Sequence, residues 1–188
     1  MTDRTESAFL SYSRGAIWLH WTIGLLVILN IALVFVSEGI SEPYGRTVMG
    51  LHKAIGITVL FLSIARLGWR ITHRPPPMPA TVAMWEKGLA HIVHWLFYAL
   101  IILIPLSGWL WMSSSLTPRP ISFFGLFDVP FLPVSPSKAR GDFLHEVHEI
   151  MGLAMIGLIV LHVAGALKHH VLEGNAFLGR MIPAFRPR

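Results

Sequence analysis

The stretch His148-Glu-Ile-Met-Gly-Leu-Ala-Met-Ile-Gly-Leu-Ile-Val-Leu-His162 decides both the fold and the chemistry of this chain. Apart from Glu149, every residue between its two histidines is apolar or glycine. At about 100° and 1.5 Å per helical residue, His148 and His162 come within about 40° of one helix face and lie about 21 Å apart along the axis. One apolar helix therefore offers an imidazole, the commonest metal-ligating side chain, near each side of a membrane.

Composition indicates that the rest of the chain also lies in lipid. Of its 188 residues, 54% are hydrophobic and only 13% are charged, and the mean hydropathy is +0.61. A soluble domain rarely has so few charges. Apolar runs of about 20 residues are long enough to span a bilayer. The sequence predicts one domain over residues 1–188, an all-α four-helix transmembrane bundle with helices at about 16–36, 48–69, 88–112 and 147–166.

Basic residues predict the orientation of this bundle. With the N-terminus inside, ten of the fifteen Lys and Arg residues fall on the inner side and five on the outer side. Because inner loops carry the excess of Lys and Arg, we expect both termini in the cytoplasm. The net charge of +5 is then a topology signal, and nucleic acid is not an expected partner. The chain contains no cysteine, which excludes disulfides, iron–sulfur clusters and covalently attached haem.

The depths of four histidines predict which helices face each other. His52 and His148 both lie near the outer start of their helices, the second and the fourth. His20 lies near the inner start of the first helix and His162 near the inner end of the fourth. Two imidazoles at one depth suit the two axial positions of a haem iron. We therefore predict two non-covalent b-type haems (heme b), an outer one held by His52 and His148 and an inner one held by His20 and His162.

Three further residues are candidates for the inner site. Arg66 lies fourteen residues after His52, so it shares that helix face at the inner level. A buried guanidinium requires an anion such as a haem propionate, and the alternative is that Arg66 extends to the lipid headgroups. His91 and His94 share a face of the third helix and enter from the inner side. Either of them could replace His20 as a ligand, or hydrogen-bond a propionate or a quinone carbonyl.

The outer side carries two features of its own. The loop between the third and fourth helices contains an apolar stretch, residues 121–127, which is too short to span a membrane. We expect it to lie on the membrane surface or to roof over a site. Basic residues on this side, among them Lys53 and Arg140, would attract an anionic substrate.

The order and spacing of these pieces resemble the prokaryotic cytochrome b561 family, which is related to the cytochrome b subunits of nickel–iron hydrogenases and formate dehydrogenases. The resemblance covers nearly the whole chain. It rests on these pieces: His20-Trp21, Leu51-His52 with Gly56, Ala65-Arg66, Gly88-Leu-Ala-His91 with His94, Pro105 and Gly108, His148-Glu149, and His162 with His169-His170.

The resemblance implies a diheme quinone oxidoreductase of the bacterial inner membrane with His20, His52, His148 and His162 as ligands. Four helices match the free-standing branch of the family. Bacterial members of that branch have been described as oxidising superoxide on the outer side and reducing ubiquinone, so a superoxide oxidase or quinone reductase is the implied enzyme. Lys53 departs from the family pattern, because an apolar residue is expected after the ligand histidine.

Two other functions compete with this one. The chain could be a cytochrome b anchor that passes electrons between quinone and a partner dehydrogenase or hydrogenase, in which case a redox partner protein should copurify. It could also be a haem-free four-helix transporter that uses its histidines to bind ions. The scarcity of acidic residues in the apolar runs argues against an ion pathway.

Overall fold

Four long helices make up most of the computed structural model, which describes residues 11–78, 82–172 and 178–182. They are α2 (Arg14–Gly39), α3 (Tyr44–Thr72), α4 (Met84–Ser113) and α5 (Lys138–Leu167). A π-helical turn, Lys168–Leu172, continues α5, and a short 3-10 turn follows at Leu178–Arg180. Within the described residues, each of the four helices is long and apolar enough to cross a membrane, which confirms the predicted multi-pass fold.

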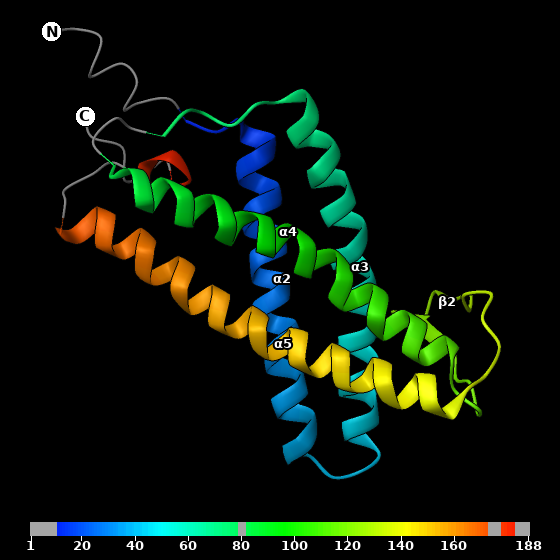
Figure 1. The fold of residues 1–188 in the computed structure, drawn as a ribbon. Helices are drawn as coiled ribbons and strands as arrows, with labels where there is room; N and C mark the ends of the chain where they lie inside the picture. Colours follow the sequence, from blue (N-terminus) through cyan, green and yellow to red (C-terminus); the bar gives the residue numbers. More distant parts are fainter. Residues whose placement is uncertain (1–10, 79–81, 173–177, 183–188) are drawn as a thin grey trace, which may run out of the picture.

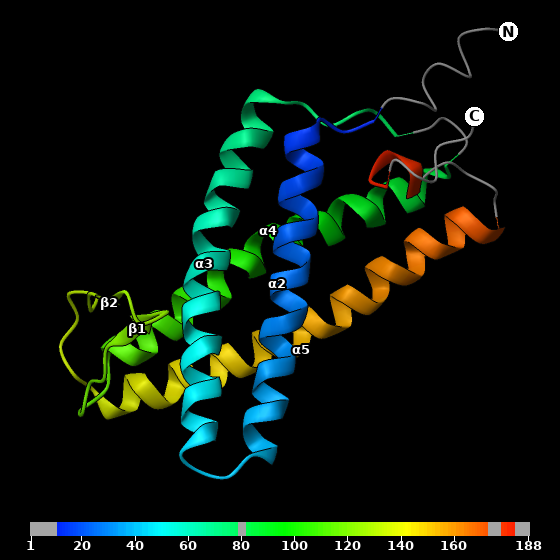
Figure 2. The ribbon, with the colours of Figure 1, turned by 180° about the vertical axis from the view of Figure 1, so that it is seen from behind.

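The helices form two antiparallel pairs. α2 packs against α3, α4 packs against α5, and α3 joins the pairs through its contact with α4. Figures 1 and 2 show the α4–α5 pair crossing the α2–α3 pair obliquely. The turn between α2 and α3 and the loop between α4 and α5 lie toward one end of the molecule. The starts of α2 and α4 and the ends of α3 and α5 lie toward the other (Figure 1).

Polar residues outside the apolar runs cap the starts of α2 and α5. Ser13 caps α2 by accepting a hydrogen bond from the backbone nitrogen of Ala16 at 3.3 Å. Ser137 caps α5 in the same way, accepting from the backbone nitrogen of Arg140 at 3.4 Å. The predicted start of the fourth helix at residue 147 was therefore too late. The first turns of α5 are polar and lie outside the apolar run, so hydropathy alone could not detect them.

Apolar contacts hold α2 and α3 together, while many large apolar side chains stay exposed. Ile23 of α2 packs against Ile55 and Val59 of α3, and all three side chains are buried. By contrast, Phe35 is 61% exposed and Ile71 is 77% exposed. Such side chains suit a surface solvated by lipid, where tails are as apolar as the side chains they meet.

The apolar stretch 121–127 folds as part of a small β-hairpin. β1 (Ile121–Phe123) pairs antiparallel with β2 (Phe127–Val129), and Ile121 stands opposite Val129. These two residues are buried against Ile57 of α3. Phe124 and Gly125 make the turn with positive φ angles of 51° and 76°. The hairpin thus covers the N-terminal half of α3, and its tight turn leaves an aromatic side chain at the tip.

Candidate functional site

The structure gathers the four predicted ligand histidines into two facing pairs. The ring centres of His52 on α3 and His148 on α5 lie 6.2 Å apart, with their planes inclined by 82°. The ring centres of His20 on α2 and His162 on α5 also lie 6.2 Å apart, with their planes inclined by 70°. All four side chains are half-buried. α5 thus contributes one imidazole to an outer pair and one to an inner pair.

The spacing within each pair fits two axial ligands of one iron. An imidazole nitrogen lies about 2 Å from the metal it binds, so two rings on opposite sides of one ion have centres roughly 6 Å apart. Both pairs match this value at 6.2 Å. No group of three or more His, Cys, Asp or Glu side chains in the described part of the chain could surround a metal ion. Haem iron needs only two protein ligands, so paired histidines suit haem.

Backbone carbonyls orient both rings of the outer pair. The Nδ1 atom of His52 lies 3.1 Å from the carbonyl oxygen of Asn30, and that of His148 lies 3.0 Å from the carbonyl oxygen of Ile104. A carbonyl only accepts, so in each ring Nδ1 carries the proton and Nε2 keeps its lone pair. A histidine that binds a metal through Nε2 is held in this way.

The inner pair has a different environment. Nδ1 of His20 lies 3.2 Å from Nη1 of Arg66, and a guanidinium can only donate. His94 of α4 is a third imidazole at this site, because its ring centre lies 5.6 Å from that of His162. The Nδ1 atom of His94 lies 2.6 Å from the carbonyl oxygen of Ala90, which leaves its Nε2 unprotonated. His91, the other candidate on α4, has an exposed side chain.

Two arginines of α3 converge on one tyrosine of α4 beside the inner pair. The Cζ atoms of Arg66 and Arg70 lie 5.7 Å and 5.2 Å from the centre of the Tyr98 ring. Arg70 also donates from Nη1 to the Tyr98 hydroxyl at 3.5 Å. The ion pairs among the described residues are Arg46–Glu42, Lys138–Asp142 and Lys168–Glu86, so neither Arg66 nor Arg70 has a carboxylate partner there. Two half-buried guanidiniums therefore gather positive charge beside the inner pair.

The two basic residues singled out on the outer side differ in their contacts. Lys53 is half-buried and interacts electrostatically with Arg119, so two positive charges lie close together. Arg140 donates from Nε to Ser114 Oγ at 3.0 Å and from Nη2 to the carbonyl oxygen of Ser135. Arg140 therefore ties the start of α5 to the end of α4 and to the loop. Sequence reasoning missed this contact because the loop residues carry no signal of it.

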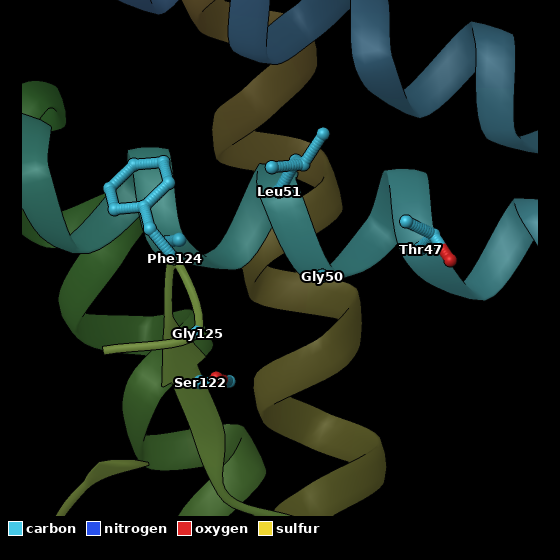
Figure 3. Close-up of a pocket in the computed structure, with 7 residues that line it drawn as sticks. Thr47, Gly50, Leu51, Ser122, Phe124 and Gly125 are labelled. Carbon is cyan, nitrogen blue, oxygen red and sulfur yellow. The ribbon is translucent and has the colours of Figure 1, made fainter. Parts of the chain in front are cut away.

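A pocket of about 300 Å³ lies between α3 and the hairpin turn (Figure 3). Leu51 and Phe124 flank it, and the remaining lining residues are Thr47, Gly50, Ala54, Ser122 and Gly125. At about 100° per residue, the α3 residues that line it point away from His52. The pocket therefore lies on the other side of α3 from the outer histidine pair.

Four apolar helices with two facing histidine pairs define a multi-pass membrane protein of the cytochrome b kind. Residues 11–184 match the family described as prokaryotic cytochrome b561, and the chain belongs to this family.

Curated relatives resemble the chain over most of its length. It is 31% identical over 166 residues to cytochrome b561 homolog 2 of Escherichia coli (strain K12), covering 87% of this chain and 86% of that protein. It is 30% identical over 183 residues to the "Probable superoxide oxidase CybB" of Yersinia pestis, covering 93% and 97%. It is 27% identical over 176 residues to cytochrome b561 homolog 1 of Escherichia coli (strain K12), covering 92% and 97%.

Proposed function

We propose that this chain is a diheme superoxide oxidase of the bacterial inner membrane that delivers its electrons to ubiquinone. The observation that carries the proposal is the pair of facing imidazoles at each end of α5, with the same 6.2 Å separation of ring centres. His52 and His148 hold the outer haem, and His20 and His162 hold the inner haem. When bound, the haems supply one-electron storage and transfer.

Different residues serve the outer and the inner side of the membrane. On the outer side Lys53 directly follows His52 and interacts electrostatically with Arg119, and positive charge attracts superoxide. On the inner side Arg66 and Arg70 balance the haem propionates. His94 lies against His162. Its Nδ1 proton is directed at the Ala90 carbonyl, so its Nε2 would donate to a propionate or a quinone carbonyl after taking up a proton.

The overall reaction balances in electrons and protons. Two superoxide ions each lose one electron and become dioxygen. One ubiquinone takes up these two electrons and two protons and becomes ubiquinol. Two histidine ligands would leave each iron no free coordination position, so the bound haems would supply electron transfer without binding an oxygen species. The similarity to a protein named probable superoxide oxidase supports superoxide as the electron donor.

The test is rapid mixing of the purified, oxidised protein with superoxide while the haem absorbance is followed. We expect haem reduction, and reoxidation when ubiquinone is added. If superoxide leaves the haems oxidised while ubiquinol reduces them, the chain is a cytochrome b that draws electrons from quinol, as an anchor subunit would. A colourless protein would contradict both functions and favour a haem-free transporter.

A further inference from the structure

One turn of α4 forms a seat for the imidazole of His148. The Nδ1 atom of His148 lies 3.0 Å from the Ile104 carbonyl oxygen and also 3.0 Å from Ser107 Oγ. Ser107 Oγ itself donates to the Ile104 carbonyl at 2.7 Å. Since the hydroxyl proton is directed at Ile104, the oxygen of Ser107 is left to accept. The Nδ1–H of His148 is therefore shared between two oxygen atoms of α4.

Gly108 completes this seat. A Cβ atom at position 108 would lie 3.0 Å from Cε1 and 3.3 Å from Nδ1 of His148. Any side chain there would push the ring away from α4 and lengthen the bond to Ser107. Ser107 is only 8% exposed, so this hydrogen bond is protected from competition by water.

The seat is specific to one of the two outer histidines. Among the described residues, His52 Nδ1 has the carbonyl of Asn30 as its partner and contacts no hydroxyl. α4 carries neither of the two proposed outer ligands, which lie on α3 and α5. α4 nevertheless provides the groups that hold the ring of His148.

We propose that Ser107 is a positioning residue that sets the ring orientation and ligand strength of His148, and through it the reduction potential of the outer haem. This inference rests on the proposed function, in which His148 is an axial ligand. A hydrogen bond from Nδ1–H to an oxygen makes an imidazole a more basic ligand. A more basic ligand stabilises ferric over ferrous iron and lowers the potential. Loss of the Ser107 oxygen should therefore raise the reduction potential of the outer haem.

The main test is a redox titration of the full-length Ser107→Ala protein. We expect the equilibrium preference of the outer haem for the ferric over the ferrous state to fall by about threefold to tenfold. At about 59 mV per tenfold for one electron, this is an upward shift of roughly 30 to 60 mV. The inner haem should keep its potential. Ser107→Thr retains the hydroxyl and should restore the outer potential.

Ser37→Ala is the matched control. Ser37 Oγ donates to the Val34 carbonyl at 2.7 Å, the same intrahelical contact that Ser107 makes, but no histidine is involved. If Ser107→Ala leaves both potentials unchanged, as we expect for Ser37→Ala, or shifts both haems equally, the positioning role is wrong. A His148→Ala protein that still binds two haems would instead contradict the proposed function.

A second variant tests the seat by its shape. Gly108→Ala should displace the ring of His148 and change the electron paramagnetic resonance spectrum of one ferric haem only. Gly24→Ala is its control, because a Cβ at Gly24 of α2 meets nothing within 4 Å. An unchanged spectrum for Gly108→Ala would overturn the inference.

Discussion

The outer and inner histidine pairs share a helix and a ring-centre separation of 6.2 Å, but their surroundings differ. Backbone carbonyls 3.0–3.1 Å away hold Nδ1 of both outer rings. At the inner pair, the Arg66 guanidinium lies 3.2 Å from Nδ1 of His20, and a third imidazole, His94, stands beside His162.

The difference lies in which ring nitrogen carries the proton: the neighbours of both outer rings accept from Nδ1, whereas Arg66 donates to Nδ1 of His20. A carbonyl can only accept, so both outer rings offer an unprotonated Nε2. Arg66 can only donate, so while it contacts Nδ1 the neutral His20 ring carries its proton on Nε2. In the proposed function His20 binds iron through Nε2, and Arg66 would then donate to another partner. A haem propionate is an anion suited to that exchange.

The largest expected effect separates the two pairs directly. His148→Ala should remove the outer haem and His162→Ala the inner one, because each substitution deletes one of two axial ligands. A pyridine haemochrome assay should show a fall from two haems per chain to one, and redox titration should show a different haem remaining in each variant. His145→Ala, three residues before His148 and exposed, is the control and should retain both. Loss of both haems from either variant would contradict the proposal that each histidine pair holds a haem of its own.

The next prediction tests which imidazole completes the inner pair. His20→Ala should remove the inner haem, whereas His94→Ala should retain it with an altered spectrum, because the ring of His94 contacts His162. Haem content and reduced absorbance spectra measure both effects. The opposite result, with haem lost only from His94→Ala, would assign His94 as the ligand and would leave the His20–Arg66 contact as it stands.

A smaller effect is expected from the charge of Arg66. Arg66→Gln should lower the midpoint potential of the inner haem, because a nearby positive charge favours the reduced iron. Coulomb's law at an effective dielectric constant of about 20 gives about 1 to 3 kcal/mol for charges several ångströms apart. Arg66→Lys keeps the charge and should shift the potential less. An equal shift of both haems would mean that Arg66 does not belong to the inner pair.

The smallest effect concerns the outer surface. Lys53→Gln should slow haem reduction by superoxide about threefold, and the difference from the unmodified protein should shrink as salt screens charges beyond about 10 Å at 0.1 M. Arg46→Gln is the control, since Arg46 is exposed and already paired with Glu42 at 2.5 Å. Arg140→Gln is a poor test of attraction because Arg140 holds the loop to α5. If the stopped-flow rate changes with neither the Lys53 substitution nor the ionic strength, electrostatic attraction of superoxide by Lys53 is contradicted.

Local periodicity predicted much of the site but little of its surroundings. The 148–162 spacing determines the facing of His148 and His162, because both lie on one helix of known rise and twist. The pairing of His52 with His148 could be argued from depth alone. The contact of Ser107 and Gly108 with His148 could not be predicted from the sequence, because the rotation of α4 toward α5 depends on packing between helices.

The sequence by itself determined four membrane-spanning helices, because apolar runs of about 20 residues have no other satisfactory structure in lipid. Only the tertiary structure decided that His94 joins the inner pair, that Arg66 contacts His20, and that residues 121–129 form a hairpin on α3. Hydropathy and helical period are properties of one segment, whereas these contacts depend on how the segments rotate and cross.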